Sequence, residues 1–124
     1  MTIEIKEVWG NQIVSLCKEY NEAIQNSKLE DCKEIIKTLL DLTKLREWRV
    51  ALRAAQSIEK IAKVNPEIIR DFAYLIINDY ENGLYLDKDA RETVIIALRK
   101  CFPYIDPIAK TSEIISSIKL NENT

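Results

Sequence analysis

The most constraining feature of this sequence is its shortage of helix-breaking residues. Among 124 residues there are two glycines and three prolines, which are Gly10, Gly83, Pro66, Pro103 and Pro107. An average chain carries roughly 7% glycine and 5% proline. This scarcity predicts long helices joined by short turns. Two of the prolines follow a residue that favours helix starts, in Asn65-Pro66 and Asp106-Pro107. Because proline is preferred at the first helical position, we expect a helix to begin at each pair.

The missing residue types argue against several kinds of chemistry. No histidine is present, so a Ser-His-Asp or Cys-His catalytic pair and a His-ligated metal site cannot form. The two glycines are too far apart for a phosphate-binding glycine loop. Acidic residues are numerous, but nothing selects a catalytic pair, and helix capping accounts for Asp87-Lys88-Asp89 better than a cation loop does. We therefore expect a chain that is not an enzyme and has no metal and no cofactor.

Charge and cysteine content predict a soluble cytoplasmic protein. The formal net charge is −2, from 18 basic and 20 acidic residues, which does not suggest nucleic acid or an anionic membrane as an obligate partner. Cys17, Cys32 and Cys101 are an odd number of widely spaced cysteines on apolar helix faces, where cysteine behaves as a small hydrophobe. The first ten residues lack the apolar core of a signal peptide, and no apolar run is long enough to span a membrane.

Apolar periodicity and capping residues predict six helices in a single domain spanning residues 1–120, followed by a disordered tail at 121–124. The expected helices cover residues 4–25, 28–42, 44–64, 66–81, 88–102 and 107–120. Ser27 and Glu30 have the spacing of a capping box, and Asp89 and Glu92 have that of an acidic version. The fourth helix is apolar on more than one side, which predicts a heavily covered position, and Asn82-Gly83 predicts its end.

These helices pair into three antiparallel hairpins at about 4–42, 44–81 and 88–120. The second helices begin near residues 28, 66 and 107, and so regular a spacing is typical of structural repeats. The segment Asp89 to Leu98, DARETVIIAL, resembles the first-helix pattern of HEAT and HEAT-like (armadillo-type) repeats. Residues 44–64 resemble it in spacing, with Ala51 in place of the arginine. The resemblance implies an all-α fold of stacked hairpins that form a short right-handed α-superhelix. The alternative is an up-and-down helical bundle.

The most concentrated charge is basic and lies on the third expected helix. Arg46, Arg49, Arg53 and Lys60 recur at steps of three, four and seven, which places them on one helical face. This basic stripe (Arg46, Arg49, Arg53 and Lys60) has the chemistry to bind phosphates or carboxylates. A solvated face, or salt bridges to acidic neighbouring helices, explains it better. Trp48 is the one aromatic residue within the stripe, and we expect it to pack between hairpins rather than to stack on bases.

The HEAT resemblance implies a non-catalytic protein-interaction module, a small scaffold or adaptor. The concave surface of such a stack is formed by the second helices, and its candidate contact residues are Lys37, Arg70, Asp71 and Lys110. The loop at 80–86 is unusually apolar, so Tyr85 is a further candidate contact. Folding back over the ends of the last two hairpins to extend the core is the favoured role for this loop. A nucleic-acid-binding module that uses the basic stripe is the alternative function. A HEAT-like glycosylase needs an acidic residue in an aromatic cleft, which the sequence does not place. Homodimerisation through the ends of the stack also remains open.

Overall fold

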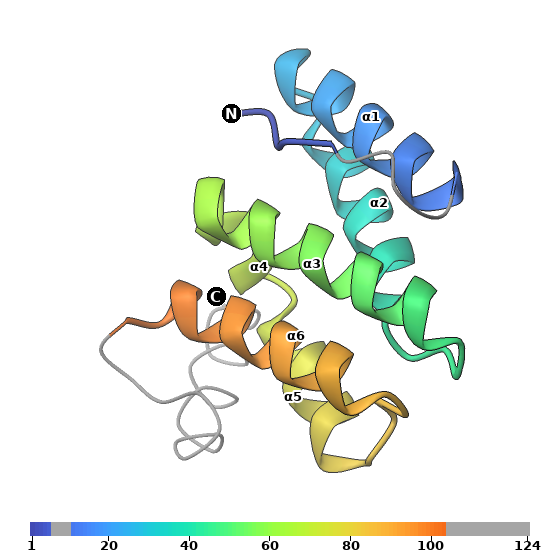
Figure 1. Ribbon diagram of the computed structural model, residues 1–124. Helices are drawn as coiled ribbons and strands as arrows, with labels where there is room; N and C mark the ends of the chain where they lie inside the picture. The colour runs from blue at the N-terminus through green and yellow to red at the C-terminus, as the bar shows by residue number, and fades with distance from the viewer. Residues whose placement is uncertain (6–10, 104–124) are drawn as a thin grey trace.

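The fold is built from α-helices, as the sequence predicts. The computed structural model describes residues 1–5 and 11–103, and these ranges contain six helices and no strand (Figure 1). The helices are α1 (Asn11–Gln25), α2 (Leu29–Leu42), α3 (Trp48–Val64), α4 (Pro66–Arg70), α5 (Ala73–Glu81) and α6 (Lys88–Cys101). The sixth expected helix at 107–120, the tail and the candidate contact Lys110 lie outside the described residues.

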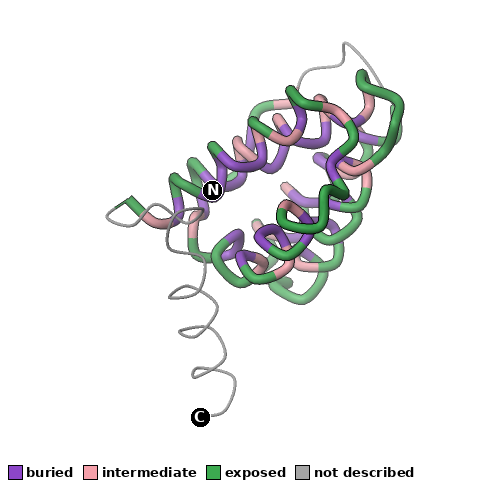
Figure 2. Tube along the Cα trace, turned by 90° about the horizontal axis from the view of Figure 1, so that it is seen from below, coloured by how far each residue is buried: buried purple, intermediate pink, exposed green. Residues whose placement is uncertain are grey.

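Helix α3 occupies the centre of the molecule and packs against α1, α2, α4 and α6. Figure 1 shows α1, α3 and α6 side by side, with α2, α4 and α5 behind them. α3 and α6 run in the same direction, so their N-terminal ends lie at the same edge. The buried positions of the two rows face each other (Figure 2). The right-handed superhelix stays a prediction, because the expected second helix of the third hairpin lies outside the described residues.

Small residues allow α3 and its neighbours to approach closely. Six alanines of α3 and α6 are completely or almost completely buried, namely Ala51, Ala54, Ala55, Ala62, Ala90 and Ala97. Larger aliphatic residues fill the space around them, including Ile58, Ile61 and Leu98, none of which is exposed. Such faces bring helix backbones together with few voids. None of the described helices has the length and apolar character needed to cross a membrane.

One expected helix is divided in the structure. Residues 66–81 form α4 and α5, separated by a turn at Asp71 and Phe72, in which the Phe72 N–H donates to the Ile69 carbonyl three residues back. The apolar residues Ile68 and Ile69 of α4 and Ile76 of α5 are all buried on either side of the turn. The prediction of one continuous helix was wrong because the apolar period continues through the turn.

The predicted helix caps are corrected in two places. Ser27 adopts a left-handed conformation with φ 56° and does not cap α2; instead the Lys28 N–H donates to the Ala23 carbonyl at 2.9 Å and closes α1. Helix α6 is capped by Asp87 rather than Asp89, since the Asp87 carboxylate accepts from the Ala90 N–H at 2.9 Å. Both capping sequences lie at a true helix boundary. At the first, however, Ser27 lies in the turn that ends α1, and at the second Asp87 is the capping residue.

Asn65 has a different role from the one its sequence context predicts. Pro66 does occupy the first turn of α4, yet the Asn65 side chain makes no cap hydrogen bond. Its amide instead donates to the Tyr20 hydroxyl at 2.7 Å and to the Met1 carbonyl at 3.1 Å. A buried side-chain network thus replaces the local cap that was expected of Asn65.

The first helix also begins later than predicted, because residues 1–5 are not helical and α1 starts at Asn11.

The packing of α6 against α3 yields a direct stability test. Leu98→Ala removes a fully buried side chain, and we expect it to lower the free energy of unfolding by about 2–5 kcal/mol. Ile96→Ala, two residues away on the same helix, is the matched control because Ile96 is 44% exposed; its cost should stay under about 1 kcal/mol. Urea unfolding followed by circular dichroism measures both. Equal costs for the two variants would contradict the described packing.

Candidate interaction surface

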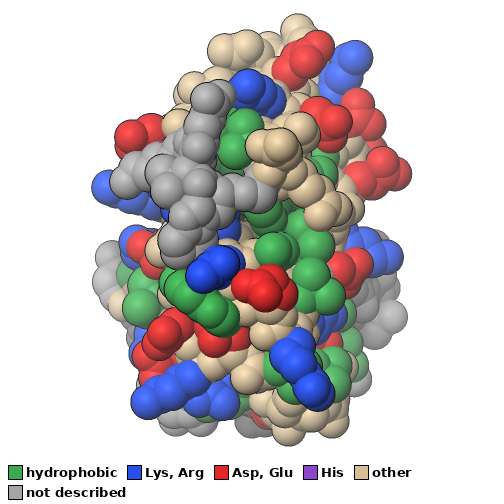
Figure 3. Space-filling model, turned by 45° about the vertical axis from the view of Figure 1, so that its right-hand side comes forward, with side chains coloured by type: hydrophobic (Ala, Val, Ile, Leu, Met, Phe, Trp, Pro, Cys, Tyr) green, Lys and Arg blue, Asp and Glu red, His purple; other side chains and the backbone are tan. Residues whose placement is uncertain are grey.

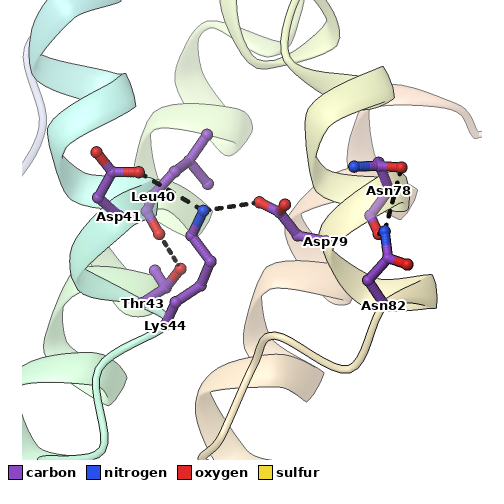
Figure 4. Close-up of polar contacts among 7 residues, drawn as sticks. All are labelled: Leu40, Asp41, Thr43, Lys44, Asn78, Asp79 and Asn82. Carbon is purple, nitrogen blue, oxygen red and sulfur yellow. Dashed lines mark hydrogen bonds and ion pairs between the residues drawn. The ribbon is translucent and has the colours of Figure 1, made fainter.

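A buried ion pair joins the turn before α3 to helix α5. The Lys44 ammonium contacts the Asp79 carboxylate at 2.9 Å and the Asp41 carboxylate at 3.5 Å (Figure 4). The Asp79 side chain is only 5% exposed, whereas that of Lys44 is 22% exposed. A carboxylate removed from water is stabilised only if it keeps a charged or hydrogen-bonding partner. Lys44 therefore anchors the 43–47 turn to α5.

Asp79 also orders the loop between α5 and α6 through its backbone. The Leu84 N–H donates to the Asp79 carbonyl at 3.0 Å, and the Gly83 N–H donates to the Tyr80 carbonyl at 3.1 Å. Gly83 has φ 67°, a left-handed conformation that glycine adopts without a steric penalty. Tyr85, the next residue of this loop, is inserted into the core. Burial and the nearby Asp79 carboxylate raise the pKa of its phenol. The loop is thereby fixed at the N-terminal end of α6.

The two ordered loops bring exposed apolar side chains to one edge of the molecule. We call this the apolar edge; its residues are Leu45 (43% exposed), Trp48 (47%), Leu84 (44%) and Leu86 (58%). Figure 1 places both loops at the edge where α3 and α6 begin, and Figure 3 shows hydrophobic side chains gathered on the face turned toward that side. The expectation that Trp48 packs between hairpins was wrong, because this residue is the exposed first residue of α3.

Two arginines flank Trp48 on the apolar edge. Arg46 and Arg49 are both exposed, and the Arg49 guanidinium lies over the Trp48 ring with 5.4 Å between its central carbon and the ring centroid. Arg46 precedes α3 in the turn, so it does not continue the helical row as predicted. Tryptophan and arginine are the side chains that most often carry the binding energy of protein interfaces.

The other half of the basic stripe lies elsewhere. Arg53 and Lys60 are half-buried and line a small cavity beside residues 4 and 5. The Lys60 ammonium donates to the Glu4 carbonyl at 3.2 Å. The structure thus separates the four residues into an exposed pair at the start of α3 and a half-buried pair further along it, rather than one continuous exposed row.

The structure places three of the remaining predicted contact residues on α2 and around the turn after α4. Lys37 is exposed on α2, and Asp71 pairs with Lys33 at 3.5 Å. Arg70 donates twice to the Cys101 carbonyl, at 2.9 and 3.2 Å, and so binds the C-terminal end of α6. Tyr85 is 4% exposed, so it is not available as a partner contact and lies in the core, the role that the sequence favoured for it. Periodicity identified polar helix positions but not the Lys44–Asp79 pair, whose members are 35 residues apart.

Acidic side chains gather at a second place without converging on a metal-binding point. A groove of about 300 Å³ between α1 and α2 is lined by Glu19, Glu22, Asp31 and Glu34, with Lys28 beside them. Within residues 1–5 and 11–103, no three or more cysteine or carboxylate side chains are grouped closely enough to hold a metal ion. The groove is therefore an acidic surface rather than a candidate metal centre.

Comparisons with known proteins identify no relative of this chain. No protein-family model, curated protein or solved structure matches the chain. The assignment of the apolar edge accordingly depends on its exposure, composition and geometry.

The Lys44–Asp79 contact predicts an asymmetric effect of lysine substitutions. Lys44→Ala leaves the buried Asp79 carboxylate without its charged partner, so the free energy of unfolding should fall by about 2 kcal/mol. Lys88→Ala is the matched control, because Lys88 pairs with Glu92 at 3.9 Å between two exposed side chains; this loss should cost under about 0.5 kcal/mol. Urea denaturation at neutral pH measures the difference, and similar costs would show that Asp79 does not depend on Lys44.

The three cysteines should be unreactive in the folded chain. All three are buried, and burial raises the pKa of the Cys101 thiol to about 11 and that of the Cys32 thiol above its usual value. Since the thiolate is the reactive form, a disulfide reagent at pH 8 should label fewer than one thiol per native chain and three in urea. Rapid labelling of native Cys101 would contradict this burial.

Proposed function

We propose that this chain is a non-catalytic protein-interaction module that binds a protein partner through the apolar edge. The observation that carries the proposal is the exposure of Trp48 at the start of α3 and of Leu45, Leu84 and Leu86 on two loops that are themselves held in place. Exposed loops with few contacts are usually polar and mobile. Here the Lys44–Asp79 ion pair and the Leu84 hydrogen bond order both loops before any partner binds. Such ordering lowers the entropic cost of binding.

The composition of the edge indicates the chemistry of the partner. Trp48 and the leucines supply apolar area, and Arg46 and Arg49 supply positive charge beside it. A complementary surface is an apolar patch that carries carboxylates, since arginine forms two parallel hydrogen bonds with a carboxylate. The module is proposed to act as a small HEAT-like scaffold or adaptor, built as a short right-handed stack of hairpins, and to work in the cytoplasm with reduced thiols.

Differential capture from the source cells tests this proposal. Tagged chain is compared with a Trp48→Ser, Leu86→Ser variant, both in extracts treated with nuclease. We expect a defined protein to be retained by the unaltered chain and reduced at least about tenfold by the variant, because hot-spot side chains carry about 1.4 kcal/mol or more each. The matched control is Leu29→Ser with Tyr74→Ser, which removes two exposed apolar side chains from α2 and α5. Equal loss with both variants would mean that general hydrophobicity, not the apolar edge, retains the protein.

The nucleic-acid alternative gives a different result in a second measurement. Electrophoretic retardation at low salt should show no shift for the unaltered chain. A shift that falls with salt and disappears in Arg46→Glu, Arg49→Glu would overturn the proposal in favour of phosphate binding. Light scattering distinguishes a partner protein from a second copy, because a homodimer would show twice the chain mass of 14.4 kDa without any partner.

A further inference from the structure

Residues 1–5 lie against the helices in the manner of a bound peptide. They are not helical, and four hydrogen bonds join their backbone to side chains of α1, α3 and the residue after α3. The Ile3 N–H donates to the Asn21 side-chain oxygen at 2.7 Å, and the Asn21 amide donates to the Ile3 carbonyl at 2.9 Å. Asn65 donates to the Met1 carbonyl at 3.1 Å and Lys60 to the Glu4 carbonyl at 3.2 Å.

Asn21 satisfies both backbone groups of one residue, as a neighbouring strand would do in a sheet. This pairing recognises extended backbone and not the identity of the side chain. Side-chain burial adds the specificity. Ile3 is 5% exposed and Ile5 packs against the core, whereas Thr2 and Glu4 are exposed. Alternation of buried and exposed residues is the register of an extended segment. The surface therefore accepts an extended segment with aliphatic residues two positions apart.

The fit around this segment is close. Glu4, Ile5, Arg53 and Lys60 line a cavity of only about 10 Å³, which is about the room of one water molecule. Asn65 is completely buried, and within the described residues its side-chain oxygen accepts no hydrogen bond. This oxygen belongs to the amide that donates to the Met1 carbonyl. A buried acceptor beside the backbone of the segment is suited to a peptide that presents one more N–H at that point.

We propose that this surface, formed by Asn21, Lys60, Asn65 and the adjoining core, is a binding site for an extended peptide of a partner protein that carries aliphatic residues two positions apart. Residues 1–5 occupy the site within the chain and compete with that peptide. The site is independent of the apolar edge, because Asn65 follows the C-terminal end of α3 and Trp48 begins its N-terminal end, roughly 25 Å away along the helix. Either proposal can fail without the other.

Displacement of the internal segment tests the proposal on the full chain. The probe is a fluorescent peptide with the sequence of residues 1–5, Met-Thr-Ile-Glu-Ile, and its binding is followed by fluorescence anisotropy. The Ile3→Asp chain places a charge in the apolar position and opens the site. It should bind the peptide at least about tenfold more tightly than the unaltered chain. In the unaltered chain residues 1–5 fill most of the sites, and the apparent affinity is the intrinsic affinity multiplied by the fraction of open sites. Thr2→Asp, at an exposed position, is the matched control and should bind like the unaltered chain.

Two further variants keep the test decisive. Adding Asn21→Ala to Ile3→Asp should abolish the gain, since the bidentate backbone contact is lost. A peptide with aspartate in place of its isoleucine at position 3 should not bind any form. If Ile3→Asp lowers the helical circular dichroism, Ile3→Ala replaces it, with an expected gain of at least about threefold. Equal peptide affinity of the opened and unaltered chains, or a gain that survives Asn21→Ala, would overturn the proposal. Exchange of residues 1–5 between two copies, seen as a dimer by light scattering, would also overturn it.

Discussion

The close packing of α3 on its neighbours is the constraint on which the rest of the structure depends. Fully buried alanines line α3 among larger aliphatic residues, so four other helices can pack closely against it. Because α6 lies beside α3 and runs in the same direction, the loops that precede the two helices lie at the same edge. The opposite end of α3 reaches residues 1–5 through Lys60 and Asn65. One central helix thus positions both proposed binding surfaces.

Polar contacts then order what the apolar core leaves at the surface. Lys44 and Asp79 form an ion pair that connects the turn before α3 with α5 and with the loop after it. At the other end of α3, Asn21 and Asn65 connect residues 1–5 to the helices. Each contact compensates a backbone or carboxylate group that folding removes from water. These polar contacts define the geometry of the surfaces, while the apolar residues provide the binding area.

The outcome of the sequence predictions differs between local and long-range features. The helical class, the three buried cysteines and the Pro66 helix start were predicted, because each depends on residues adjacent in sequence or repeated every three to four positions. The turn at Asp71 and Phe72 was missed because the apolar period is the same on both sides of it. The exposure of Trp48 was missed as well, because an aromatic residue at a helix end fits a buried or an exposed environment equally well.

The sequence by itself determined that this chain forms helices, roughly where they begin and end, and which faces they bury. Scarce glycine and proline, periodic aliphatic residues and local capping groups act over a few neighbouring positions, so their effect can be derived from the residue order. Only the tertiary structure decided which exposed residues lie together. The Lys44–Asp79 pair spans 35 residues and the Asn65–Met1 contact spans 64. Contacts of that length depend on how the helices pack, which no local pattern encodes.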